Sequence, residues 1–354
     1  MSLKKFACPC CGAELTFSAE AQKMSCEYCG TELDVEAVEA LSSNEKADDS
    51  MNWDSYDSEN LTPEDGSCAY VCNSCGASIV GDKTLAASEC PYCGSPVIMS
   101  DKVEGMMKPD FIIPFKVNKE KAAEQFKKFC SKRPLLPTGF MNDHKIESVE
   151  GLYVPYWLFD CDCDADLRFR AERVTHWTED SYDVTKTDHF LLLRKGSMGF
   201  DHVPVDGISK VDNEITEAVE PFATKEAVDF NSAYLSGYLA DRFDEDAESC
   251  KPRANQRIKQ SVINAMERTA LGYASVRYED GNVIFNDGKI HYALMPMWIM
   301  TAKYKDKKYT FAMNGQTGRF VGELPVSMGK FWGMLLGITA GLTALFTLIG
   351  MALA

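Results

Sequence analysis

The chain has 354 residues, 45% of them hydrophobic, which is enough for two or three domains with substantial cores. Its 37 Lys and Arg against 53 Asp and Glu give a net charge of −16, and residues 34–67 alone hold 11 acidic residues against one lysine. Outside that segment the charge is close to balanced. No region offers the basic face that neutralises a phosphate backbone, which argues against binding of DNA or RNA.

Two copies of a cysteine module dominate the N-terminal part of the chain. Residues 1–33 hold two C-x-x-C pairs, and residues 68–100 repeat them 64 residues later with identical internal spacing. Neighbouring positions repeat as well, among them Tyr28 with Tyr92. We interpret the pattern as an internal duplication. The eight cysteines are Cys8, Cys11, Cys26, Cys29, Cys72, Cys75, Cys90 and Cys93.

The cysteine spacing predicts two structural zinc sites. Each pair is followed by a glycine, which lets the backbone turn so that its amide groups point at a thiolate. Two such knuckles joined by a hairpin place four sulfurs in the tetrahedral geometry of Zn²⁺ and leave no open position for a catalytic water. The N-terminus lacks the apolar core of a signal peptide, so metal in a reducing compartment explains the pairs better than disulfides. We predict two zinc ribbons with one Zn²⁺ each, and assign neither Cys10 nor Cys68 to metal.

Residues 34–67, between the two ribbons, are predicted to be an acidic, flexible linker. Val35 and Val38 have the spacing of a short helical turn, but the remainder is rich in Ser, Asp, Asn and Glu and has little to bury. Trp53 and Tyr56 are the exception, because a mixture of acidic and aromatic residues is also typical of a docking peptide. The composition favours the solvated linker over the docking peptide.

Residues 105–328 are predicted to form a β-rich α+β domain with helical insertions. Asn118 is placed to cap a helix, and residues 254–270 show a second helical pattern. The motif V-P-Y-W-L at 154–158 has an echo in M-P-M-W-I at 295–299, which is compatible with a duplicated domain and equally with coincidence. The strands are predicted in DFIIPFKV and in residues 151–174, 187–200, 282–287, 291–304 and 307–315.

No set of residues in this domain forms a recognisable catalytic motif, and we predict that the protein is not an enzyme. The five histidines are scattered, and neither a G-x-x-x-x-G-K-[ST] loop nor a G-x-G-x-x-G after a strand is present. In DCDCDAD, residues 160–166, strand alternation places the aspartates on one face and Cys161 and Cys163 on the other. The run lacks the glycine and glutamate of an EF-hand loop, so we interpret it as a solvated strand face.

Residues 331–354 are predicted to cross a membrane once. The stretch has no charged residue and, as a helix rising about 1.5 Å per residue, is long enough for a hydrocarbon core of about 30 Å. Gly333, Gly337 and Gly341 share one stripe, which either packs two helices of a homo-oligomer or reflects the abundance of glycine in membrane helices. Lys330 precedes the span and no charge follows it. This asymmetry and the reduced thiolates favour a cell-membrane protein whose N-terminal domains lie in the cytoplasm.

Four phrases of the sequence resemble the bacterial membrane-anchored TFIIB-type zinc-ribbon proteins. The resemblance implies an adaptor or scaffold that recruits a partner protein, of the SPFH-domain (stomatin- and flotillin-like) class, at the cytoplasmic membrane during envelope stress. The ribbon type alone motivates an alternative, a membrane-tethered regulator that binds nucleic acid, which the absence of a basic face disfavours. The phrases are PDFIIPFKVNKEKA (109–122), GLYVPYWLFD (151–160), AYLSGYLADRFD (233–244) and KKYTFAMNGQTGRFVGELPVS (307–327).

Overall fold

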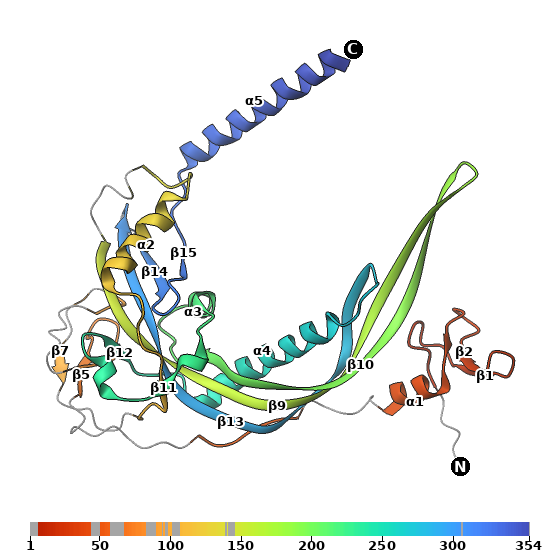
Figure 1. The fold of residues 1–354 in the computed structure, drawn as a ribbon, viewed down its shortest axis with the longest axis horizontal. Helices are drawn as coiled ribbons and strands as arrows, with labels where there is room; N and C mark the ends of the chain where they lie inside the picture. Colours follow the sequence, from red (N-terminus) through yellow and green to blue (C-terminus); the bar gives the residue numbers. More distant parts are fainter. Residues whose placement is uncertain are drawn as a thin grey trace. The chain divides into compact units, whose positions relative to one another are not determined.

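Helices and strands are mixed along the chain, which confirms the predicted α+β class (Figure 1). Two compact units divide the chain: unit 1 comprises residues 1–52, 162–199 and 259–286, and unit 2 comprises residues 53–161, 200–258 and 287–354. The computed structural model describes residues 6–43, 50–56, 67–82, 90–93, 95, 98–100, 107–138, 140, 146–305 and 307–353.

The N-terminal ribbon belongs to unit 1 and consists of a small antiparallel sheet followed by a helix. Its elements are β1 (Thr16–Ser18), β2 (Lys23–Ser25), β3 (Glu32–Leu33) and α1 (Val35–Ser43), with the strands in the order β1-β2-β3. Cys8, Leu15 and Cys26 of the ribbon form a buried cluster with Val38 of α1. Because Val38 packs on two of the cysteines, α1 is docked on the folded ribbon.

Three unusually long strands supply residues to both units. They are β9 (Ile146–Glu179), β10 (Tyr182–Asp206) and β13 (Ser275–Tyr304). At 34, 25 and 30 residues, they far exceed the usual strand of about 5–6 residues. The separate strands predicted at 282–287 and 291–304 are one strand in the structure. Asp287 has a left-handed φ of 51° there, as residues at β-bulges do, and pairing continues past it.

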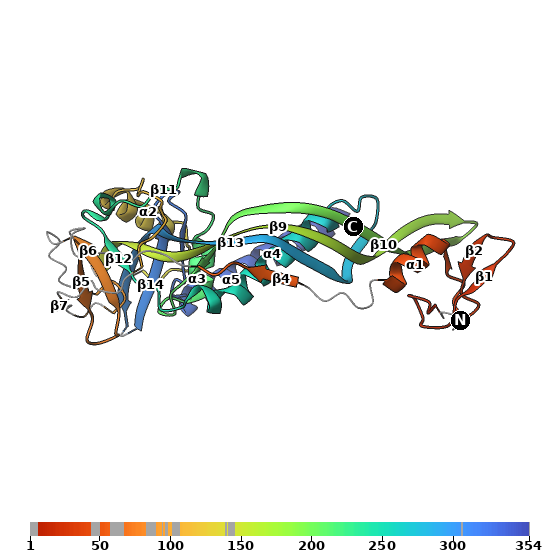
Figure 2. The same cartoon turned by 90° about the horizontal axis from the view of Figure 1, so that it is seen from below.

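The remaining elements lie mostly in unit 2, where short strands surround the long ones. Figure 2 shows β5, β6 and β12 side by side, in agreement with the sheet order β11-β8-β13-β9-β12-β6-β5-β7. The short strands are β4 (Ser50–Trp53), β5 (Ser67–Val71), β6 (Ser78–Asp82), β7 (Ile98–Ser100), β8 (Phe111–Ile112), β11 (Val228–Asp229), β12 (Leu239–Asp241), β14 (Lys307–Asn314) and β15 (Phe320–Gly322). The helices are α2 (Lys119–Ser131), α3 (Asn213–Val219), α4 (Ala247–Glu267) and α5 (Met328–Leu353), with 3-10 turns η2 (Thr224–Glu226) and η3 (Ser232–Leu235).

Helix α2 shows how the predicted pattern becomes structure. The side chain of Asn118 accepts a hydrogen bond from the backbone N–H of Lys121 (3.0 Å), so the predicted N-cap is confirmed. Phe126 and Cys130 on the apolar face of α2 are buried against β13 and β14, where Phe311 lies 5.2 Å from the Phe126 ring. Figure 1 shows α2 lying along β14 and β15.

The central domain is built from two related halves, β8-α2-β9-β10 and β12-α4-β13-β14. The short strand of each half pairs in parallel with the long strand of the other half. In one case β12 pairs with Leu152 and Tyr153 of β9, and in the other β8 pairs with Ala293 and Leu294 of β13. Each of these pairings ends immediately before one of the two echoed motifs. The halves are therefore interlocked, and neither completes its sheet alone.

The echoed motifs also make equivalent hydrogen bonds, so the echo reflects a structural duplication. In each motif, the proline carbonyl accepts a hydrogen bond from the backbone N–H of a glycine that directly follows the next long or hairpin strand. The tryptophan indole N–H of each motif donates to a backbone carbonyl just before a helix of the other half. The paired contacts are Gly207 N to Pro155 O (3.0 Å) with Gly315 N to Pro296 O (2.8 Å), and Trp157 Nε1 to Glu245 O (2.9 Å) with Trp298 Nε1 to Val117 O (2.8 Å).

Residues 50–56 lie against the β domain. Strand β4 pairs with β13, and the ring of Trp53 lies 5.0 Å from Phe159. The Trp53 indole N–H donates to Asn255 Oδ1 (2.7 Å), and the Tyr56 hydroxyl donates to Asp110 Oδ2 (3.0 Å). These aromatic residues therefore dock, and they dock onto their own chain.

The helical turn expected at Val35 and Val38 is present as α1, whereas the flexible linker predicted for the remainder of residues 34–67 is wrong for residues 50–56. Composition alone does not predict this docking, because a few apolar residues at fixed positions are enough to dock a short polar segment on an existing surface. Residues 44–49 and 57–66, which carry much of the acidic charge, lie outside the described residues.

Helix α5 contains residues 331–353 of the predicted membrane span, and residue 354 lies outside the described residues. Among the described residues it is the one helix long and apolar enough to cross a bilayer, over Met328–Met351, with a mean hydropathy of 1.9 and none of that stretch buried. The start of the helix is tied to unit 2, because the backbone N–H of Ser327 donates to the carbonyl of Leu135 (2.8 Å).

The close approach of backbones at Gly281 generates a test of the long strands. A Cβ at Gly281 would lie 2.4 Å from the carbonyl oxygen of Asp166 and 2.7 Å from Cα of Leu167, and its φ is 142°. We expect Gly281→Ala to lower the free energy of unfolding by about 1–3 kcal/mol in denaturant titrations of the detergent-solubilised chain. Gly196→Ala is the control, because its Cβ meets only Met266 Cε at 3.5 Å. Equal effects of both substitutions would contradict the strand packing described.

Candidate metal centres

Each half of a ribbon is a tight knuckle whose geometry requires its glycine. In ribbon 1, residues 6–33, the N–H of Gly12 donates to the Cys8 carbonyl and the N–H of Gly30 donates to the Cys26 carbonyl, both at 2.8 Å. These glycines have φ values of 77° and 71°, in the left-handed region that side chains disfavour. Gly76, with φ 72°, bonds Cys72 in the same way at 2.8 Å. The repeated spacing in the sequence thus corresponds to a repeated backbone conformation.

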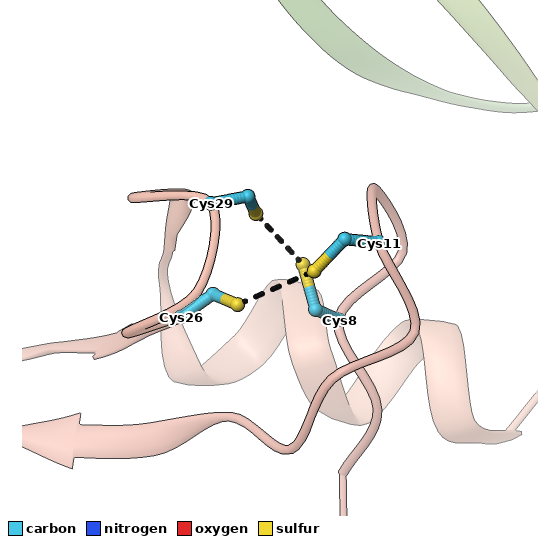
Figure 3. Close-up of side chains that lie close together, drawn as sticks. All are labelled: Cys8, Cys11, Cys26 and Cys29. Atoms are coloured by element: carbon cyan, nitrogen blue, oxygen red, sulfur yellow. Dashed lines mark hydrogen bonds between the residues drawn. The ribbon is translucent and has the colours of Figure 1, made fainter.

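The four sulfurs of ribbon 1 converge on one point (Figure 3). Cys8 Sγ lies 3.6 Å from Cys29 Sγ, and Cys11 Sγ lies 3.5 Å from Cys26 Sγ. All four sulfurs lie within 4.8 Å of one another. Each knuckle contributes one buried and one exposed cysteine.

Ribbon 2, residues 67–100, repeats this arrangement. Cys72 Sγ lies 3.4 Å from Cys93 Sγ, Cys75 Sγ lies 3.6 Å from Cys90 Sγ, and again all four lie within 4.8 Å. A tetrahedral Zn²⁺ with Zn–S bonds of about 2.3 Å separates its sulfurs by about 3.8 Å. Both sets are therefore suited to a metal ion with four thiolate ligands and are consistent with the predicted zinc sites.

A hydroxyl residue supports one thiolate in each ribbon, at equivalent positions of the repeat. The Thr31 hydroxyl lies 3.0 Å from Cys29 Sγ, and its hydrogen bond, together with the Thr31 backbone N–H, lowers the pKa of that thiol to about 6. Burial raises the pKa of Cys93, but hydrogen bonds from the Ser95 hydroxyl and N–H outweigh it and lower the pKa to about 6. These polar neighbours favour the ionised sulfur that a metal requires.

The surroundings of the two ribbons differ. Cys72, Ala77 and Cys90 of ribbon 2 belong to the main hydrophobic core of unit 2, together with residues such as Leu152 and Val154 of β9. Strand β6 of this ribbon pairs with β12, which continues the sheet into β9. Ribbon 2 is therefore an integral part of the β domain.

A polar contact, which the sequence analysis did not identify, fastens ribbon 2 to the domain. The Tyr92 hydroxyl donates a hydrogen bond to Oδ2 of the buried Asp241. Lys210 Nζ lies 3.7 Å from Asp241 Oδ1 and 6.0 Å from the Tyr92 ring centroid. Burial raises the pKa of Asp241 to about 6, although Lys210 and the Tyr92 hydrogen bond favour the carboxylate. The only sequence signal for this contact is the repeat of Tyr28 at Tyr92.

Ribbon 1 makes no comparable use of its tyrosine. Tyr28 stands where ribbon 2 has Tyr92, and its side chain is 84% exposed. The neighbouring residue Glu27 is exposed as well, whereas Pro91 at the same place in ribbon 2 is buried. An exposed hydrogen bond from Arg170 of β9 reaches the Pro9 carbonyl of ribbon 1 (3.3 Å). The same module thus occurs twice in the chain: ribbon 2 is buried in the core of unit 2, and ribbon 1 leaves its tyrosine exposed.

The other candidate sites do not gather metal ligands. The alternation predicted for DCDCDAD is confirmed, because Cys161 and Cys163 are buried while Asp162 and Asp164 are exposed. Asp160 pairs with a histidine, since His291 Nε2 lies 3.3 Å from its Oδ2. Within the described parts of the chain, the two cysteine sets are the groups in which three or more potential ligands converge.

The structure assigns no new role to the three glycines of the membrane span or to the two cysteines that were not assigned to metal. Gly333, Gly337 and Gly341 lie on α5, where an added Cβ at any of them would meet no atom within 4 Å. Packing of two α5 helices therefore stays a prediction. Cys10 is exposed at the edge of ribbon 1, and Cys68 lies on β5.

Comparison with known proteins identifies a relative in Bacillus subtilis (strain 168). The chain is 35% identical over 244 residues, 69% of its length and 72% of the relative's, to a protein described as "Uncharacterized protein YdjG". The chain belongs to the YdjG family. No protein-family model matches the sequence, and no solved structure matches it. The resemblance to membrane-anchored TFIIB-type zinc-ribbon proteins stays a prediction.

The different settings of the ribbons predict different costs of losing each metal site. We expect Cys26→Ser to remove about one of two zinc ions and to leave the unfolding of unit 2 unchanged, because ribbon 1 has its own small core. Cys90→Ser, at the equivalent place in ribbon 2, should also destabilise unit 2 by about 3 kcal/mol or more, since Cys90 lies in its core. Elemental analysis gives the zinc content and denaturant titration the stability. Equal losses of stability would contradict the difference in setting.

The Asp160–His291 pair predicts a defined pH dependence. The hydrogen bond between His291 and Asp160 raises the pKa of His291. Burial raises the pKa of Asp160, but the hydrogen bonds from His291 and from the His202 backbone N–H outweigh this effect and lower the pKa of Asp160. The pair therefore stabilises the fold between the two pKa values. Its contribution is lost above about pH 6.5 as His291 deprotonates at its raised pKa, and below about pH 3.9 as Asp160 protonates at its lowered pKa.

We expect His291→Gln to cost about 1 kcal/mol of unfolding free energy at pH 5.5 and less at pH 9. His189→Gln is the control, because His189 is 69% exposed and its partner Glu172 is 44% exposed. A cost for His291→Gln that is the same at both pH values would show that the ion pair does not form.

Proposed function

We propose that the protein is a membrane-anchored zinc-ribbon adaptor that recruits a partner protein through ribbon 1. The observation that carries this proposal is the contrast between the two copies of the module. Ribbon 2 completes the chain's own β domain, and ribbon 1 leaves the equivalent residues exposed. A closed four-cysteine site stabilises a small fold and offers no open position for chemistry, which fits a recognition module.

The environment of Tyr92 indicates what ribbon 1 would bind. In ribbon 2 the tyrosine hydroxyl meets a carboxylate and a lysine lies near its ring. Ribbon 1 carries exposed Glu27 next to Tyr28 in the chain and exposed Glu32 four residues further on, so this exposed segment has one aromatic and two acidic residues. We infer that the partner presents lysine or arginine beside a hydrogen-bond acceptor, because these groups complement both features. An acidic surface repels phosphate, which disfavours nucleic acid as the ligand of ribbon 1.

Helix α5 supports a location at the membrane. Its length and hydropathy suit a single membrane span. Thiolate sites need a reducing compartment, and Lys330 at the start of the span is positive, so the two units would face the cytoplasm. The resemblance drawn from the sequence makes an SPFH-domain protein the first partner to test, and an envelope-stress response the first setting.

The proposal is tested by co-purification from membranes of the native host. We expect the tagged full-length chain, solubilised in mild detergent, to retain a membrane-associated protein that carries a basic surface. Nuclease treatment should leave this recovery unchanged. Recovery of nucleic acid in a salt-dependent manner, without a protein partner, would instead support the membrane-tethered regulator.

Tyr28→Ala should lower the recovery of the partner at least about tenfold, because exposed tyrosines that bury in an interface are frequent hot spots. Tyr182→Ala is the matched control, since Tyr182 is 76% exposed outside the ribbons. Zinc content and unfolding should be unchanged in both variants. Unaltered recovery with Tyr28→Ala would show that ribbon 1 does not bind the partner through this surface.

A further inference from the structure

A cavity of about 720 Å³ lies at the foot of the membrane helix. One wall is formed by Tyr304 and Lys305 near the end of β13 and by Lys307 and Tyr309 of β14. The other wall is the connection 323–329, which leads from β15 into α5. All of these residues belong to unit 2.

The walls of this cavity are held in place by contacts on both sides. The ring of Phe140 lies 5.7 Å from Tyr304 and 6.0 Å from Tyr309, which fixes the two tyrosines relative to each other. On the opposite wall, Lys330 Nζ donates to the Leu136 carbonyl (2.6 Å), next to the bond that ties Ser327 to Leu135. The cavity is thus a built feature of the fold.

The hairpin wall is cationic in a strongly acidic chain. Lys305 Nζ lies 5.5 Å from the Tyr304 ring centroid, and Lys307 Nζ lies 5.3 Å from that of Tyr309. In the described part of the chain, no carboxylate forms an ion pair with either ammonium group, and Glu323 is the acidic side chain of the lining. Two ammonium groups and two phenol hydroxyls at one wall are suited to an anion with several oxygens, such as a phosphate.

The opposite wall is apolar, which distinguishes this cavity from a binding site for a free anion. Leu324, Val326 and Met328 line it, and the latter two are 55% and 61% exposed. Hydrophobic residues of α5 continue the apolar surface away from the cavity, starting at Phe331. A ligand that fits both walls carries its charge at one end and hydrocarbon at the other.

The position along α5 places the cavity at the depth of lipid headgroups, if α5 spans the bilayer as the proposed function requires. The uncharged part of the helix, from Phe331 to its end, covers a hydrocarbon core of about 30 Å at about 1.5 Å per residue. Trp332 at its start is 55% exposed, as residues of the aromatic interface belt are. Residues 323–329, together with Lys305 and Lys307, therefore lie just outside the hydrocarbon.

We propose that this cavity binds the headgroup of an anionic phospholipid, with its phosphate at Lys305 and Lys307 and its acyl chains along Val326, Met328 and α5. The site selects negatively charged lipids and fixes the height of the β domain above the cytoplasmic leaflet.

The test uses the full-length chain in non-ionic detergent, with dioctanoyl phosphatidylglycerol as the anionic probe and dioctanoyl phosphatidylcholine as the zwitterionic one. We expect native mass spectrometry and calorimetry to give at least about tenfold tighter binding of phosphatidylglycerol, because each basic residue near an anionic surface strengthens binding. Lys305→Gln/Lys307→Gln should abolish the preference. Lys225→Gln/Lys289→Gln, which removes the same charge from exposed positions outside the cavity, should retain it.

Equal affinity for both lipids, or an unchanged preference in the Lys305/Lys307 variant, would overturn the proposal. Glycerol 1-phosphate that binds as tightly as phosphatidylglycerol would also overturn it, since the site would then recognise a free phosphate. The proposed membrane anchoring is tested by a different result. Release of the chain from membranes at high salt without detergent would contradict the anchoring, whereas loss of the lipid preference alone would leave it standing.

Discussion

The structure depends on the convergence of four cysteine sulfurs in a module whose apolar core is very small. A knuckle turns tightly because its glycine adopts a left-handed conformation, as at Gly12 and Gly76, and two knuckles then bring four thiolates within 4.8 Å. A module of this size has little apolar surface to bury, so a metal ion held by the four sulfurs would supply folding free energy. The chain uses this solution twice, in two settings.

In the first setting, Val38 and Leu15 pack with two of the cysteines and the ribbon is nearly self-contained. In the second, the cysteines join the core of a large domain, and the Tyr92–Asp241 bond adds a polar contact. That domain is itself duplicated, with each short strand paired to the long strand of the other half. An interlocked domain, followed in the chain by a helix apolar enough to span a bilayer, is consistent with the proposed membrane-anchored adaptor.

Much of this architecture could be predicted from the sequence because the relevant signals are local. Cysteine spacing, the Asn118 cap and the uncharged stretch of α5 each depend on residues close together in the chain. The contacts that distinguish the ribbons could not be predicted in this way. Tyr92 and Asp241 are far apart in sequence, and a tyrosine looks the same whether buried, as at 92, or exposed, as at 28. Composition predicts a linker at residues 50–56 because it contains no information about the aromatic partners that Trp53 and Tyr56 have on β9.

Hydrogen exchange of the full-length protein in detergent during slow zinc chelation tests the central claim most directly. If ribbon 1 is displayed and ribbon 2 is embedded, amides of residues 6–33 lose protection first, while those of β5, β6 and β12 stay protected until β9 opens. Simultaneous loss of protection in both ribbons, or earlier loss in ribbon 2, would contradict the account.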